Sequence, residues 1–101
     1  MRLAWTDRAL EGVRETARYI AADDAAAARR WADGLFDAVE RLADFPESGR
    51  LAPELEDRGV RELVCGAYRV FNRVGAGTVL ILTVRHAGQL IREDEVAEGR
   101  T

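Results

Sequence analysis

Apolar residues recur at helical spacing in two segments of the first half of the chain. The first segment repeats them every three or four positions, at Leu10, Val13, Ala17 and Ile20. The second does the same at Ala28, Trp31, Leu35, Ala38, Leu42 and Phe45. Thr6 or Asp7 can cap the first helix, Asp23 and Asp24 can cap the second, and Pro46 ends it near Phe45. Because the turn between them is short, the two helices are predicted to form an antiparallel hairpin.

Short runs rich in β-branched residues predict four strands, at residues 2–5, 60–65, 68–74 and 78–86. The last three are separated by brief glycine-containing breaks, at residues 65–67 and 75–77, which are typical of hairpin turns. Residues 46–59 read as a loop, with Leu51 and Leu55 pinning it to the core. The predicted fold class is therefore α+β.

Alternation along the later strands predicts which side chains share a face. Within 68–74, the residues Arg69, Phe71 and Arg73 should point one way, and their neighbours the other. Strict alternation in 78–86 would place Leu80, Leu82, Val84 and His86 on one face, and Val79, Ile81, Thr83 and Arg85 on the other. This strand is apolar on both faces over most of its length, which predicts a central position in the sheet.

The length of 101 residues fits one small domain spanning residues 1–101. No apolar run approaches the roughly 20 residues that a membrane span needs, and the first residues lack the apolar core of a signal peptide. The single cysteine cannot form an internal disulfide. These features indicate a cytoplasmic protein without a membrane partner.

Charge is unevenly distributed, and every basic residue is an arginine. Residues 1–49 carry 7 Arg and 10 acids, residues 50–92 carry 7 Arg and 4 acids, and residues 93–101 carry 1 Arg and 4 acids. The absence of lysine excludes any mechanism with a lysine acid or base. The basic sheet-forming half favours an acidic protein partner or phosphates.

The main candidate site is a set of arginines on the predicted sheet, comprising Arg50, Arg61, Arg69, Arg73 and Arg85. Guanidinium groups bind carboxylates and phosphates through a planar fork of donors. Each arginine taken alone is better explained as a sheet residue paired with Glu47, Glu54 or Glu62, but the set as a whole favours a binding face. Phe71, flanked by two of these arginines, would either anchor a partner segment or lie under a helix.

His86 is the other candidate, since a lone histidine at a strand end can act as a general acid or base. A half-buried structural role is the favoured alternative, because no partner lies near it in sequence. Cys65 reads as a small buried apolar residue. No metal-ligand spacing and no phosphate-binding glycine motif is present, so neither a metal nor a cofactor is expected.

Four segments together resemble the RelE/ParE toxins of bacterial type II toxin–antitoxin modules. They are Trp5-Thr6, Tyr19–Ala21, Phe45–Arg50 leading to Pro53–Leu55, and Arg61–Val64 followed by Tyr68–Phe71 and Ile81–His86. The resemblance covers nearly the whole chain and implies the order β-α-α-β-β-β, with a helix hairpin packed on a mostly antiparallel four-stranded sheet.

The resemblance implies one of two activities. ParE-like members inhibit DNA gyrase by protein–protein binding, whereas RelE-like members cut messenger RNA on the ribosome. Of the ribonuclease pattern this chain keeps Arg69, but it has Gln89 and Glu95 where the distal arginine and the catalytic tyrosine would fall. The first hypothesis is therefore a ParE-like toxin that causes growth arrest and helps to stabilise a plasmid.

Such a toxin would be neutralised by a cognate antitoxin, a DNA-binding repressor with a flexible tail, and would meet DNA only through the antitoxin or gyrase. The tail would wrap the helix hairpin and lay apolar and acidic side chains on the sheet. The expected partner-binding residues are Arg61, Arg69, Phe71, Arg73, Arg85 and His86. The alternatives are a ribosome-dependent endoribonuclease using Arg69, Arg85 and His86, or an inactive member serving as a co-repressor.

Overall fold

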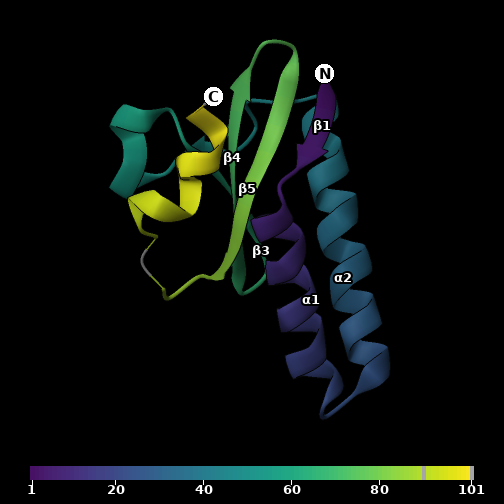
Figure 1. The fold of residues 1–101 in the computed structure, drawn as a ribbon. Coiled ribbons are helices and arrows are strands. Elements are labelled where there is room, and N and C mark those ends of the chain that lie inside the picture. The colour runs from purple at the N-terminus through teal and green to yellow at the C-terminus, as the bar shows by residue number, and fades with distance from the viewer. Residues whose placement is uncertain (90, 101) are drawn as a thin grey trace.

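The computed structural model describes residues 1–89 and 91–100, with side chains through residue 96 apart from residue 90. A helix hairpin packs on one face of a sheet (Figure 1). The elements run β1 (Arg2–Trp5), α1 (Asp7–Ala21), α2 (Ala25–Glu40), β2 (Arg50–Leu51), β3 (Arg61–Cys65), β4 (Tyr68–Gly75) and β5 (Thr78–His86). The described residues also form three 3-10 helices, η1 (Arg41–Ala43) after α2, η2 (Pro53–Arg58) between β2 and β3, and η3 (Glu93–Arg100) after β5. The α+β class is confirmed.

The sheet has five strands in the order β1-β5-β4-β3-β2, so the prediction of four strands was wrong. The additional strand is β2, which lies inside the predicted loop 46–59 and pairs antiparallel with β3 through Arg50 and Leu51. Two residues are too few to show alternation, and for this reason the sequence did not reveal the strand. β1 is parallel to β5, and the other pairs are antiparallel. The predicted central position of β5 is confirmed, because it lies between β1 and β4.

Both helices begin at the predicted kind of cap. The hydroxyl of Thr6 accepts a hydrogen bond from the backbone N–H of Ala9 at 3.1 Å, and the carboxylate of Asp24 accepts one from Ala27 at 3.1 Å. The second helix ends earlier than expected, at Glu40, and continues as η1. Phe45 therefore falls outside the helical stripe and is 64% exposed.

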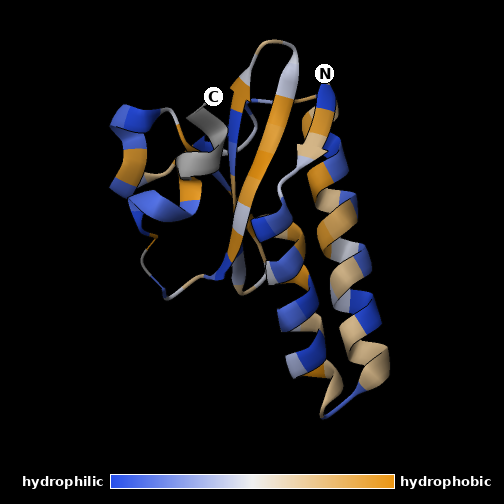
Figure 2. Ribbon diagram, viewed as in Figure 1, coloured by the Kyte–Doolittle hydropathy of each residue, from blue (hydrophilic) through white to orange (hydrophobic). Residues whose placement is uncertain are grey.

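Two apolar cores lie on opposite faces of the sheet. The first packs the helix hairpin on the sheet and contains Ala9, Val13, Leu35, Val39, Leu42, Val70, Val79, Ile81 and Val84. The second contains Ala52, Leu55, Val60, Phe71, Leu82, Ile91 and Val96. Leu55 is buried as predicted, whereas Leu51 is 39% exposed. Figure 2 shows hydrophobic colours along much of β5, which contributes to both cores.

The second face of the sheet is covered by the chain itself. Figure 1 shows η2 and the C-terminal segment on the side of the sheet away from the helix hairpin. Within this cover, Val96 is 1% exposed and Ile91 is 6% exposed. The C-terminal segment thus occupies sheet surface on which the sequence had placed a partner.

A bulge in β5 overturns the strict alternation expected along this strand. Phe71 pairs with Thr83 and Asn72 pairs with Ile81, so the pairing skips Leu82. Leu82 therefore packs in the second core, while Val84, two residues later, packs in the first. An extra residue in one strand shifts every later side chain to the other face. Arg85 consequently lies opposite Arg69, and His86 lies opposite Tyr68.

Within the described residues, no helix combines the length and the apolar character that a membrane crossing requires.

Two glycine-to-alanine changes should have opposite effects on stability. A Cβ at position 49 would lie 2.6 Å from the backbone oxygen of Glu62, which β3 holds in place, whereas at position 34 it would meet nothing within 4 Å. We expect Gly49→Ala to lower the free energy of unfolding by about 1–3 kcal/mol. Gly34→Ala, inside α2, should raise it by about 0.5–1 kcal/mol. Urea denaturation measures both, and equal effects would contradict the close approach of Gly49 to β3.

Candidate functional site

Arg69 lies at the centre of a set of charges that we call the Arg69 cluster, comprising Arg69, Glu54, Glu62 and Arg50. Arg69 and Glu62 are buried, Glu54 is partly buried and Arg50 is exposed. Its Nη1 and Nη2 donate to the two carboxylate oxygens of Glu54 at 2.9 and 2.8 Å, a bidentate contact. Its Nε donates to Oε2 of Glu62 at 2.6 Å, and the other oxygen of Glu62 accepts from Nε of Arg50 at 2.6 Å. Two positive and two negative charges therefore balance within the cluster.

Three elements bring the Arg69 cluster together. Arg69 lies on β4, Glu62 on β3 and Glu54 on η2. Glu62 is paired in register with Phe71, and the Arg69 guanidinium lies 4.6 Å from the centre of the Phe71 ring. This stacking adds a cation–π contact and excludes water from one side of the cluster. The residue Arg69 as a whole is only 8% exposed, and Phe71 and Glu62 are more deeply buried.

The ion pair between Arg69 and Glu54 shifts the pKa of both side chains. Hydrogen bonding to Arg69 lowers the pKa of Glu54 from its ordinary 4.5 to about 2, against the opposing effect of burial. Donating hydrogen bonds to Glu54, and then to Glu62, in turn raises the pKa of Arg69. Arg69 and Glu54 thus stay charged and paired at neutral pH.

The predicted arginine set is only partly gathered. Arg85 lies directly opposite Arg69 in the register of β4 and β5, on the face that also carries Phe71. Arg73, two residues beyond Phe71 on β4, is assigned to this face by alternation. Arg61 is adjacent to Glu62 on β3 and is directed away from this face, where its Nη1 donates to the backbone oxygen of Gly49 at 2.8 Å.

The alternative explanation of these arginines, as partners of nearby glutamates, is what the contacts show for Arg50 and Arg69. Arg69 binds Glu54 and Glu62, and Arg50 binds Glu62. Arg61 also approaches the backbone oxygen of Glu47, at 3.4 Å. The sequence analysis named Glu95 only as the residue at the position of the family's catalytic tyrosine, and not as a partner of Arg85. In the structure Glu95 is 2% exposed and pairs with Arg85 at 2.8 Å. No local pattern indicates this pairing, because only the return of the chain over the sheet buries Glu95.

His86 lies away from the Arg69 cluster. Alternation after the bulge places it beside Tyr68, with the ring centres 5.5 Å apart and nearly perpendicular. Its Nδ1 accepts a hydrogen bond from the backbone N–H of Gly88 at 3.2 Å. His86 is exposed and helps to line a hollow of about 430 Å³, together with Tyr19, Tyr68 and Arg85.

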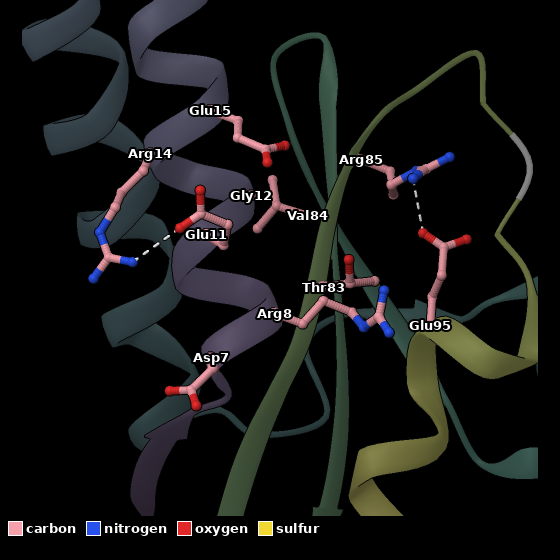
Figure 3. A pocket seen from close by; sticks show the side chains of 10 residues that line it. All are labelled: Asp7, Arg8, Glu11, Gly12, Arg14, Glu15, Thr83, Val84, Arg85 and Glu95. Atoms are coloured by element: carbon pink, nitrogen blue, oxygen red, sulfur yellow. Dashed lines mark hydrogen bonds and ion pairs between the residues drawn. The ribbon is translucent and has the colours of Figure 1, made fainter.

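A larger hollow of about 630 Å³ lies between α1 and the C-terminal part of β5 (Figure 3). Figure 3 shows the side chain of Arg85 directed toward Glu95, and Arg8 reaching across from α1. Four carboxylates line this hollow, from Asp7, Glu11, Glu15 and Glu95, against three guanidinium groups, from Arg8, Arg14 and Arg85. This balance of charge does not favour a phosphate-rich ligand, which needs an excess of cations.

The three residues expected of a ribonuclease do not converge. The donors of Arg69 are occupied by buried carboxylates, and His86 lies on the opposite face of the sheet. Cleavage of RNA requires an acid and a base on either side of one phosphate, with cations around it. Of the three, Arg85 and His86 are neighbours in one hollow, while Arg69 lies outside it.

Comparison with known proteins identifies close relatives of this chain. Residues 3–91 match the family model described as the ParE toxin of the type II toxin–antitoxin system parDE. The protein named Y4kP from Sinorhizobium fredii is 40% identical over 90 residues, covering 87% of this chain and 90% of the relative. Toxin RelE2 from Caulobacter vibrioides is 38% identical over 89 residues, covering 87% of this chain and 97% of the relative.

The fold also matches a solved structure. A chain of the chromosomal ParDE toxin–antitoxin system from Pseudomonas aeruginosa superposes with a TM-score of 0.72, at 22% identity, over 85% of this chain and 95% of that chain. At this identity the likeness concerns the fold.

Removing one member of the Arg69 cluster should destabilise the protein strongly. Glu62→Gln leaves Arg69 and Arg50 without the carboxylate that they share, and a buried charge that loses its partner costs about 3–5 kcal/mol. Chemical denaturation at pH 7 measures this loss. The control is Glu47→Gln, at an exposed side chain, which should change the free energy of unfolding by less than about 0.5 kcal/mol. A loss below 1 kcal/mol for Glu62→Gln would contradict a tightly coupled cluster.

The Glu54 carboxylate should make the stability of the fold depend on pH in the acidic range. Because the folded state lowers its pKa from 4.5 to about 2, the ion pair contributes fully above pH 4.5 and is lost as the pH falls toward 2. Glu54→Gln should therefore flatten the decline of the melting temperature over this window. Glu56→Gln, an exposed neighbour in η2, should leave the decline unchanged. Identical profiles for both variants would refute the assignment.

Proposed function

Because the chain belongs to the ParE family of toxins from type II toxin–antitoxin systems, we propose that it acts by binding DNA gyrase. In this proposal the toxin performs no chemistry of its own. Binding stabilises cleaved complexes of gyrase with DNA, blocks replication and arrests growth. A module of this kind would also stabilise a plasmid that carries it.

Membership of the family implies a cognate antitoxin as partner. We propose that this antitoxin is a DNA-binding repressor with a flexible tail, so that the toxin meets DNA only through the antitoxin or through gyrase. Since both gyrase and a repressor act on DNA, the proposed location is the cytoplasm.

The observation that carries the proposal is the state of Arg69. A catalytic guanidinium must be free to bind a phosphate in the transition state, but the donors of Arg69 already bind Glu54 and Glu62 inside the fold. Freeing them would leave two carboxylates buried or partly buried without their partner. This arrangement suits a rigid docking module better than an RNA-cleaving site.

The sequence-derived binding residues divide into two roles in this proposal. Arg85 and His86 line accessible hollows and would contact the partner directly. Arg73 would add to the contact from the same strand face as Arg69. Arg69 and Phe71 are enclosed, and would act by holding the sheet surface rigid from inside. Arg61 would hold the turn before β2 through Gly49.

One observation favours the ribosome-dependent ribonuclease as the second candidate. His86 accepts a hydrogen bond from Gly88 at Nδ1, and the residue lines an accessible hollow together with Tyr19, Tyr68 and Arg85. An imidazole beside a guanidinium could move a proton at a 2′-hydroxyl. This candidate would operate without Arg69.

Two assays with purified toxin distinguish the candidates. We expect loss of supercoiling and accumulation of cleaved plasmid when gyrase is present, and no new cuts in translated messenger RNA by toe-printing. The reverse pattern would support the ribonuclease. If neither signal appears, the result would indicate an inactive co-repressor and would refute the gyrase proposal.

Substitution of His86 adds a matched test. Gln keeps hydrogen-bonding capacity but cannot exchange a proton near neutral pH, so His86→Gln should change gyrase inhibition by less than about fivefold, equivalent to about 1 kcal/mol. A general acid or base would lose about 10²–10⁴-fold in RNA cleavage on the same change. Retained growth arrest with His86→Gln therefore counts against the ribonuclease.

A further inference from the structure

A groove between α2 and the end of β3 lies apart from the hollows described above. Its volume is about 360 Å³, and its apolar lining includes Trp31, Leu35, Ala38, Val64 and Cys65. Val64 is 60% exposed, which is unusual for a large apolar residue in a strand. β2 covers β3 only at Arg61 and Glu62, so no described strand flanks Val64 on that edge. An apolar surface of this kind is costly to leave in water.

The groove is also positively charged. Arg30 and Arg41 contribute guanidinium groups to it, and its lining contains no acidic residue. Neither arginine forms an ion pair with any acid among the described residues. The two arginines are eleven positions apart along a helical stretch, which corresponds to roughly 16 Å. A ligand with apolar side chains between two acidic ends would match this layout.

Gly34 lies on α2 within the same groove. Glycine inside a helix costs about 0.5–1 kcal/mol relative to alanine. The fold itself does not need it, because a Cβ at this position would meet nothing within 4 Å. A missing side chain at an open helix surface allows a second backbone to approach closely.

Trp31, which also lines this groove, carries a buried hydrogen-bond donor without an acceptor in the part of the chain that the structure describes. Its indole Nε1 is shielded from water and has no hydrogen-bond acceptor among the described residues. Tyr68 contacts the indole ring edge-on, which helps to fix its orientation. A buried donor without an acceptor is destabilising, so within the described residues this edge of the groove carries an unsatisfied polar group.

We propose that this groove receives an amphipathic helix of the cognate antitoxin, about three turns long, with acidic side chains at both ends. The apolar face of this helix covers Val64 and Leu35, and its backbone passes close to Gly34. Its carboxylates pair with Arg30 and Arg41. The proposal rests on the antitoxin partnership described above, and it assigns the surface and the chemistry of the recognition.

The test uses the full-length toxin and the full-length cognate antitoxin, with affinity measured by calorimetry. The double variant Arg30→Glu/Arg41→Glu reverses both charges, and Gly34→Leu fills the groove at a position where the fold leaves room. We expect each to weaken binding at least about tenfold, the scale of a lost charged contact or a blocked pocket. Arg29→Glu is the matched control, because Arg29 is exposed on the same helix but does not line the groove.

Thermal unfolding and gyrase inhibition complete the test. Gly34→Leu should retain or raise the melting temperature, so that weaker binding cannot be attributed to misfolding. All variants should inhibit gyrase as the unmodified toxin does. Equal antitoxin affinity for groove and control variants overturns the proposal, as does loss of gyrase inhibition with normal antitoxin binding, since the groove would then belong to gyrase. If the unmodified toxin does not inhibit gyrase, the proposed function fails while the affinity result still decides the groove.

Discussion

A buried guanidinium shared between two glutamates is the constraint on which the second half of this protein depends. Arg69 cannot be buried without Glu54 and Glu62, because an unpaired charge inside a protein is prohibitively unfavourable. Meeting this requirement draws η2 onto the sheet and orders β3 beside β4. Phe71, stacked beneath the guanidinium, then becomes the floor of a second apolar core, which Ile91 and Val96 close.

Because of this constraint, the arginine that stabilises the fold is not among those that remain accessible to a partner. The sheet face that carries Arg69 is filled by the chain's own acidic and apolar residues, so its most conspicuous arginine serves the fold. Accessible polar side chains remain at Arg85 and His86 beside α1, and accessible charges at Arg30 and Arg41 beside β3. These two regions lie apart from each other, which would allow a target and an antitoxin to use different surfaces of one small toxin.

Local patterns predicted much of the architecture because the interactions behind them are local. The caps at Thr6 and Asp24, the hairpin turns and the central position of β5 all follow from neighbouring residues. The features that the sequence did not predict depend on contacts between residues distant in sequence. β2 has only two residues, and its existence depends on Glu62 and Arg61 across the sheet. The skip at Leu82 depends on the register with β4, which no pattern within β5 encodes.

The sequence by itself determined the family, the α+β class, the helix hairpin and the concentration of arginine on the sheet-forming half. The family was indicated by the resemblance of four segments to RelE/ParE toxins. The other features follow from periodicity, capping and composition, which the order of residues carries directly. Only the tertiary structure decided which arginines are available. Pairing of Arg69 with Glu54, 15 positions away, and of Arg85 with Glu95 requires contacts across elements and the burial that makes them strong. The sequence shows which residues are charged, but which of these charges are paired depends on distances that folding sets.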